Sequence, residues 1–133
     1  MTERLEKELA LLRAVFPDAE FHDVEGGWFH IPHYTVQFGG WAQPEVAVCF
    51  HVPDGYPGVN PYAFWVSPPL RLAGTNRRPG NDYLEPSRTP FPGIWGKFSW
   101  TPVDPWCPGA EPGSGSNLLN FVLSFRDRFR EGP

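Results

Sequence analysis

Residues 51–69, HVPDGYPGVNPYAFWVSPP, leave one strand pattern and enter another within a few positions. The stretch holds five prolines and two glycines among aromatic and aliphatic residues. Proline fixes the backbone angle φ and lacks an N–H group, so a turn rich in proline is stiff and cannot join a strand ladder. The stretch therefore predicts a rigid turn that reverses the chain between two β-strands.

The residues on either side of this turn have the patterns of strands. Residues 45–52, EVAVCFHV, alternate in character and place Val46, Val48 and Phe50 on one face of a strand. Residues 62–66, YAFWV, are rich in β-branched and aromatic residues, which favour strands. The sequence thus predicts two consecutive strands that run antiparallel.

A further strand is predicted upstream, over residues 28–38, WFHIPHYTVQF. Pro32 interrupts its alternation, and a proline inside a strand indicates an edge strand or a bulge that shifts the pattern. Together these segments predict an antiparallel meander of three or four strands.

Helical patterns stand at the two ends of the chain. Apolar residues at helical spacing predict an amphipathic helix over residues 2–16, with Thr2 as its cap. A second helix is predicted over residues 116–130, capped by Ser116 or Asn117. Strands grouped between terminal helices predict an α+β fold with both helices on one face of the sheet.

Between the last predicted strand and the second helix, residues 67–115 show no pattern of a long element. They contain most of the prolines and three of the six tryptophans. A structureless segment of this length is uncommon in a compact domain and is usually functional.

The composition limits the classes of function. A chain of 133 residues corresponds to one domain, here residues 1–133. Its 14 glycines and 17 prolines are offset by an aromatic content of 16%, which favours a folded chain over a disordered one. The net charge of −4 and the lack of a basic cluster argue against nucleic-acid binding. No apolar run suits a membrane span and no signal pattern is present, so we expect a cytoplasmic protein.

Two segments resemble the ubiquitin-conjugating enzyme superfamily. VPDGYPGVNPYAFWV resembles the family's passage from one strand through a Tyr-Pro-x-x-x-Pro turn to the next strand, with Tyr56, Pro57 and Pro61 in the motif positions. The segment from Trp106, with Pro108, to the leucines at 118 and 119 resembles its Trp-x-Pro segment before a helix. The resemblance spans nearly the whole chain and implies a fold of the ubiquitin-conjugating type.

The chain departs from that family at the catalytic positions. The family carries His-Pro-Asn shortly after the third strand, whereas no histidine follows His51 here. Counting back from Trp106 to the family's catalytic cysteine reaches KFSW, residues 97–100, which contains no cysteine. In these respects the chain is similar to diverged bacterial members and to the cysteine-less ubiquitin-enzyme variants and RWD domains.

Cys107 is the candidate catalytic residue, because it is the one thiol in the loop-rich segment. Thioester transfer needs an accessible thiolate, and glycine and proline neighbours favour exposure. Asp104 lies nearby, and an acidic neighbour raises the pKa of a thiol. No basic residue, which would lower this pKa, follows closely. The alternative is an incidental loop cysteine. Cys49, on a predicted strand, is expected to be a small buried residue.

Four aromatic residues are candidates for binding the extended tail of a modifier or another peptide, namely Trp95, Phe98, Trp100 and Trp106. Tryptophan provides contact area at a low entropy cost and therefore makes a good anchor. The alternative is that these side chains form a satellite core that fixes the long segment.

No metal site or cofactor is predicted. His30 and His33 straddle Pro32, but no fixed spacing of cysteine or carboxylate accompanies them, so exposed strand positions are the preferred interpretation. The segment GSGSN before the second helix lacks the lysine and preceding strand of a phosphate loop.

Three functions remain as hypotheses. The first is a non-catalytic module of a bacterial-type ubiquitin-like modifier pathway, which binds a modifier, an activating enzyme or a target. The second is an active conjugating enzyme that carries a thioester on Cys107. The third is a peptide-binding domain unrelated to modifiers, because a fold does not determine a function. Absence of a cysteine from residues 97–100 favours the first.

Overall fold

The computed structural model describes residues 1–36, 38–102 and 104–133. Gln37, in the strand predicted over 28–38, and Val103, in the segment predicted to be irregular, lie outside the described residues. In chain order the elements are α1 (Glu3–Val15), β1 (Glu20–His22), β2 (Trp28–Thr35), β3 (Glu45–His51), β4 (Phe64–Ser67), β5 (Tyr83–Leu84), β6 (Gly96–Phe98), the short 3₁₀ turn η1 (Pro112–Ser114) and α2 (Leu118–Glu131).

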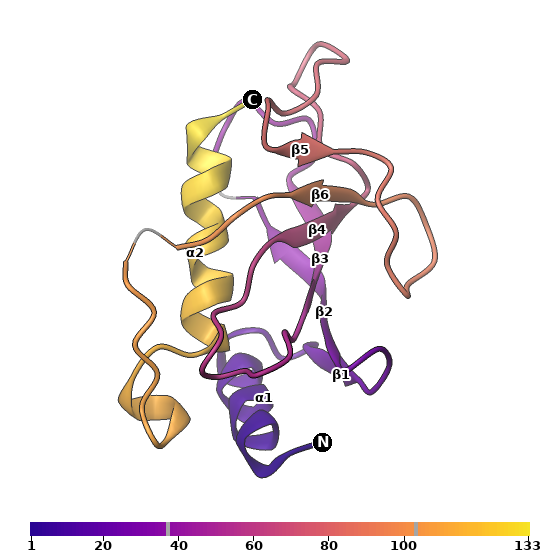
Figure 1. Cartoon of the computed structure of the whole chain (residues 1–133). Helices are drawn as coiled ribbons and strands as arrows, with labels where there is room; N and C mark the ends of the chain where they lie inside the picture. The colour runs from indigo at the N-terminus through magenta and orange to yellow at the C-terminus, as the bar shows by residue number, and fades with distance from the viewer. Residues whose placement is uncertain (37, 103) are drawn as a thin grey trace.

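The described strands form one antiparallel sheet of six strands in the order β1-β2-β3-β4-β6-β5. Figure 1 shows α2 along one face of this sheet, with α1 near the N-terminal end of α2. The α+β class, the two terminal helices and the antiparallel sheet are therefore as predicted. Neither helix within the described ranges is long and apolar enough for a membrane crossing.

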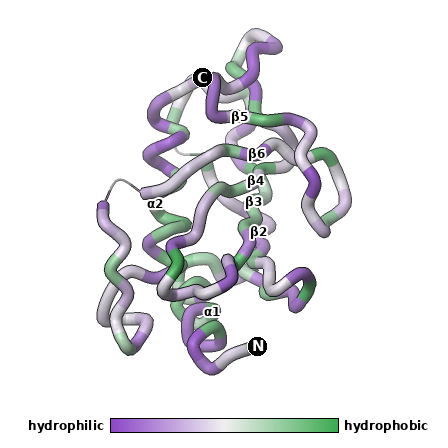
Figure 2. Tube along the Cα trace, viewed as in Figure 1, coloured by the Kyte–Doolittle hydropathy of each residue, from purple (hydrophilic) through white to green (hydrophobic). Residues whose placement is uncertain are grey.

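Both helices begin at side-chain caps. The Thr2 side chain accepts a hydrogen bond of 3.1 Å from the Leu5 N–H group. Asn117, one of the two predicted caps, starts α2 in a reciprocal capping box with Asn120. Such caps satisfy backbone donors that have no partner inside the helix. Along its length α2 alternates between apolar and polar residues, as Figure 2 shows.

Pro32 lies at a disturbance of β2, as the sequence predicted. The register between β2 and β3 shifts between Ile31 and Tyr34, so the strand carries an irregularity around the proline. β1 pairs with β2 only as far as His30. The missing N–H group of Pro32 therefore costs no ladder hydrogen bond on that side of β2.

The prediction of three or four strands is an underestimate, because β1 lies outside the predicted ranges and the segment 67–115 supplies β5 and β6. β6 pairs with β4 and with β5, so it lies between strands that precede it in the chain. With three and two residues, β6 and β5 are too short to show an alternating pattern. The remainder of the segment is largely irregular, as predicted.

The two faces of the sheet are packed differently. On the helix side, buried residues of α1, α2 and the strands form a single large core that contains Leu12, Phe50 and Phe125. On the far side, a smaller cluster consists of Trp28, Cys49, Ala63, Trp65 and Trp95. The connection between β5 and β6 covers this far-side cluster: the Trp65 indole N–H donates to Ser87 Oγ at 2.9 Å. Figure 1 shows this connection on the side of the sheet away from α2.

Gly96 in β6 is required by a close approach of Tyr83. A Cβ atom at position 96 would overlap the Tyr83 phenol group, which packs on Phe98 with ring centroids 4.9 Å apart. We expect Gly96→Ala to lower the free energy of unfolding by about 1–3 kcal/mol, as over-packing of a closed site does. Gly113→Ala is the matched control, because a Cβ there meets no atom within 4 Å. Equal melting curves for the two variants would contradict this packing.

Candidate functional site

The Tyr-Pro turn and the Trp-x-Pro segment are in direct contact, although they are far apart in the sequence. The Trp106 indole N–H donates a hydrogen bond of 2.8 Å to the Pro57 carbonyl oxygen. The Tyr56 and Trp106 rings lie 5.9 Å apart. Pro61, at the end of the turn, is buried. The two segments that carry the resemblance therefore form one corner of the molecule.

A buried carboxylate joins this corner to both helices. Glu8 of α1 is fully buried, and its Oε1 accepts a hydrogen bond of 2.6 Å from the Leu118 N–H group at the start of α2. Its Oε2 accepts hydrogen bonds from the Tyr56 hydroxyl group and from Arg4 Nε, the latter at 3.1 Å. A negative charge at this place also favours the positive end of α2. We call this arrangement the Glu8 junction.

The Glu8 junction shows how Tyr56 is fixed. Tyr56 is half-buried and packs against the helix-side core. Burial raises the pKa of its phenol group, and the neighbouring Glu8 carboxylate raises it further. The hydroxyl group therefore remains a hydrogen-bond donor at neutral pH. It links the turn to α1 and, through Glu8, to the first residue of α2.

Glu8 was missed as a candidate, although the sequence contains a signal for it. Its position falls among Leu5, Leu9 and Leu12 on the apolar face of α1, all of which are buried. A charged residue on the buried face of a helix needs a partner, because an unpaired buried charge is costly. The partners could not be foreseen, since Tyr56 and Leu118 are distant in sequence.

Cys107 is exposed and lies in the loop that leads to α2. Its backbone N–H donates to Ser116 Oγ at 2.9 Å, and its carbonyl oxygen accepts from the Ser116 N–H group at 2.9 Å. Among the residues that the structure describes, no hydrogen bond or ion pair brings a histidine, lysine or arginine to its thiol. Cys49 is fully buried, and burial raises the pKa of its thiol. Cys107 is therefore the accessible cysteine, and no described basic residue partners its thiol.

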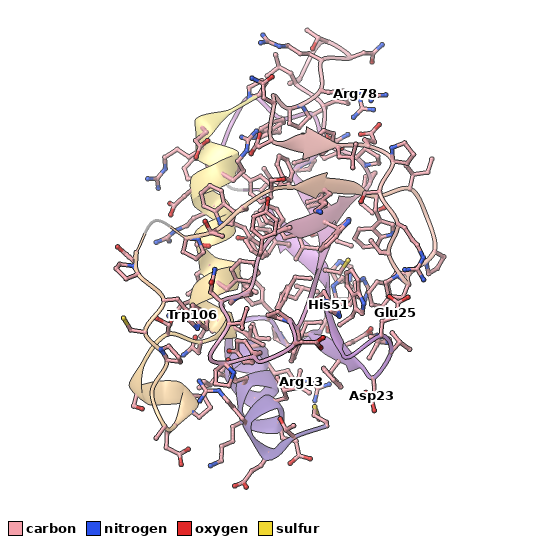
Figure 3. All side chains as sticks on the ribbon, viewed as in Figure 1. Arg13, Asp23, Glu25, His51, Arg78 and Trp106 are labelled. Atoms are coloured by element: carbon pink, nitrogen blue, oxygen red, sulfur yellow. The ribbon has the colours of Figure 1, made fainter. Side chains whose placement is uncertain are left out.

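A cleft lies at Trp106, between residues 104–106 and the outer side of α2. Its volume is about 360 Å³, and Trp106, Ser116 and Arg126 are among the residues that line it. Figure 3 shows Trp106 beside α2. We call it the Trp106 cleft. Both apolar and polar side chains line it, and among the charged ones are the acidic Asp127 and the basic Arg126.

The four aromatic candidates do not form one exposed surface. Trp95 belongs to the far-side cluster, whereas Phe98 and Trp100 belong to the helix-side core. Trp95, Phe98 and Trp100 are buried, so their positions agree with a structural role in fixing the segment 67–115. Trp106 is the partly exposed member of the group, and it borders a cleft.

His30 and His33 are close in sequence but have different partners in the structure. His33 Nδ1 lies 2.7 Å from Glu45 Oε1, whereas His30 Nδ1 lies 3.2 Å from Glu20 Oε1. His30 and His33 therefore do not share a site. His51 Nε2 is 2.6 Å from the Glu25 carbonyl oxygen near the β1–β2 turn, where Figure 3 labels both residues. A group formed by Glu20, His22 and His30 was not indicated by spacing, because it depends on the register of β1 and β2.

Comparisons of the chain with models of protein families, with curated proteins and with solved structures found no match.

Proposed function

We propose that the chain is a ubiquitin-conjugating-like binding module of a bacterial-type ubiquitin-like modifier pathway, which holds a modifier or its activating enzyme without carrying a thioester. One observation carries the proposal: the Tyr56–Pro57 turn and Trp106 pack together beside α2, and the accessible Cys107 that follows Trp106 has no basic partner among the described residues. Direct contact between the two resembling segments supports a common scaffold.

The binding surface in this proposal is the Trp106 cleft. An extended tail, such as the flexible end of a ubiquitin-like modifier, can contact the Trp106 ring and hydrogen-bond to polar groups of α2. Trp95, Phe98 and Trp100 are buried, so in this proposal they have structural roles and do not touch the tail. A cytoplasmic location is expected, since such pathways use ATP and reduced thiols.

The alternative is an active conjugating enzyme that uses Cys107, and the exposure of this residue favours it. A nucleophilic cysteine usually has a lowered pKa, supplied by a cation or a helix N-terminus. The exposed Asp104 lies three positions away instead. The binding module therefore accounts better for the surroundings of the thiol.

Thioester formation separates the two functions. The protein is incubated with ATP, an activating enzyme and a ubiquitin-like protein encoded near its gene, and is then run on a non-reducing gel beside Cys107→Ser. We expect no adduct sensitive to thiol reductant on the wild type, while calorimetry detects binding of the modifier or the activating enzyme. An adduct that Cys107→Ser abolishes would overturn the non-catalytic role and identify an enzyme. Absence of both adduct and binding would contradict the pathway itself.

A further inference from the structure

A carboxylate and two imidazoles meet on the outer hairpin of the sheet. β1 and β2 pair antiparallel with Glu20 opposite His30, and His22 lies two residues after Glu20 on the same side of β1. Glu20 Oε1 is 2.9 Å from His22 Nε2 and 3.2 Å from His30 Nδ1. The three ligand atoms all lie within 4.8 Å of one another. We call these residues the His-His-Glu cluster.

We propose that the His-His-Glu cluster is a Zn²⁺-binding site. Zinc binds histidine nitrogen and carboxylate oxygen at about 2.0–2.2 Å, so two ligands of a tetrahedral site lie roughly 3.3 Å apart. Both histidine–glutamate distances are already close to this value. A small movement of the imidazoles breaks their hydrogen bonds to Glu20 and, with each ring proton on the other nitrogen, directs all three ligand atoms at a single ion.

Phe91 holds both imidazole rings in place. The His30 ring stacks on Phe91 with centroids 4.7 Å apart and an interplanar angle of 19°. The His22 ring meets the same phenyl group edge-on at 4.9 Å. Phe91 itself is fixed by a hydrogen bond of 3.1 Å from its N–H group to Thr89 Oγ1. Rings that are already ordered lose less conformational entropy when they bind an ion.

The charge of the cluster suits a divalent cation. A glutamate carboxylate is ordinarily ionised at neutral pH, so Glu20 supplies a negative charge beside the two imidazoles. Two imidazoles and one carboxylate, without a thiolate, favour zinc, copper and nickel over calcium and magnesium, which prefer oxygen ligands. All three side chains are partly exposed, so the fourth position of the ion is open to water or to a ligand from a partner.

The position of the cluster gives zinc a mechanical effect on the sheet. β1 has three residues and is one of the two edge strands, paired only with β2 in the described sheet. An ion shared by ligands from both strands joins this short edge strand to its neighbour. The ion binds the folded chain, because the unfolded chain separates its ligands. Zinc therefore raises the melting temperature, and above the dissociation constant the rise grows with the logarithm of the zinc concentration.

The test is a calorimetric titration of the metal-free protein with ZnCl₂, followed by Co²⁺ absorption spectroscopy of the same site. We expect one Zn²⁺ per chain, visible Co²⁺ d–d bands typical of a low-symmetry site, and a higher melting temperature with zinc. His30→Ala and His22→Ala should each weaken Zn²⁺ binding by at least about 10–100-fold, since even partners of metal ligands have effects of this size. Glu20→Gln serves as a near-isosteric variant that preserves the hairpin.

His33→Ala is the matched control. His33 lies on β2, as His30 does, but it is outside the cluster. It also has carboxylate neighbours, Glu45 at 2.7 Å and Asp18 at 4.0 Å. Its replacement should leave Zn²⁺ affinity and stoichiometry unchanged. The proposal is overturned if the wild type binds no zinc, if Glu20→Gln and His30→Ala bind it as well as the wild type, or if His33→Ala loses binding to the same extent. Circular dichroism of each variant shows whether its fold is retained, and the proposed function does not enter any of these readouts.

Discussion

Glu8→Ala is expected to lower the free energy of unfolding by about 3–5 kcal/mol, the range for removing one partner of a buried charged network. The substitution leaves three donors without an acceptor: the Leu118 N–H group, the Tyr56 hydroxyl group and Arg4 Nε. It also removes the carboxylate from the positive end of α2. Urea unfolding followed by tryptophan fluorescence measures the change.

Two further variants define the origin of this loss. Glu3→Ala removes a carboxylate from the same helix at a position where the side chain is 84% exposed, and we expect a change below about 1 kcal/mol. Glu8→Gln retains an acceptor oxygen but loses the charge, so its effect should fall between the other two. A loss in Glu8→Ala no larger than that in Glu3→Ala would contradict the Glu8 junction.

Phe125→Ala is expected to cost about 3–5 kcal/mol of unfolding free energy, as deletion of a fully buried phenyl group does. Phe125 lies on α2 at the centre of the helix-side core. Its ring stacks on Phe64 of β4 with centroids 3.9 Å apart and meets Phe121 edge-on at 4.9 Å. The cavity left by alanine is bordered by both the helix and the sheet, so neither can close it without losing other contacts.

The control for this prediction is the next residue on the helix. Arg126 is exposed, and Arg126→Ala should change stability by less than about 0.5 kcal/mol. Phe125→Leu keeps part of the volume and should show an intermediate loss. If Phe125→Ala and Arg126→Ala unfold at the same denaturant concentration, α2 does not pack on the sheet through this face.

Local patterns predicted the parts of the fold that depend on local spacing. The helices followed from apolar periodicity and from Thr2 and Asn117 as caps, and the structure confirms both. The disturbance at Pro32 followed from the missing N–H group and appears as the register shift in β2. These features depend on residues within a few positions of each other, where steric and hydrogen-bonding rules apply directly.

The order of the strands could not be predicted in the same way. β6 enters the sheet between β4 and β5, although β5 precedes it in the chain. Residues 96–98 have no pattern that identifies their partner. Once β6 is known, its alternation explains the aromatic residues, since Trp95 and Phe98, three positions apart, point to opposite faces. Without that strand, the four aromatic candidates could be read as one groove.

The candidate sites also divide into those that local sequence indicates and those that depend on strand pairing. The sequence identified Cys107 as the one thiol in the loop-rich segment and Trp106 through the Trp-x-Pro resemblance; in the structure Cys107 is exposed and Trp106 lines a cleft. The His-His-Glu cluster depends on the pairing of Glu20 with His30, which a sequence alone does not reveal. Sites formed across a register require the sheet to be known first.

The most direct test of the proposed function is a ¹⁵N–¹H NMR titration of the labelled protein with the ubiquitin-like protein encoded near its gene. Each tryptophan has an indole N–H group that reports on one place, and those of Trp106 and Trp65 lie at the cleft and on the far side of the sheet. Arg126→Glu alters the cleft, and Arg77→Glu makes the same charge change at an exposed position away from it.

We predict that the Trp106 indole signal shifts with added modifier while that of Trp65 does not, and that Arg126→Glu weakens binding while Arg77→Glu leaves it unchanged. The titration extends to about 1 mM, where even a binding free energy of about −4 kcal/mol is detected. No shift at that concentration with the modifier or its activating enzyme, or shifts confined to the far side, would contradict the account.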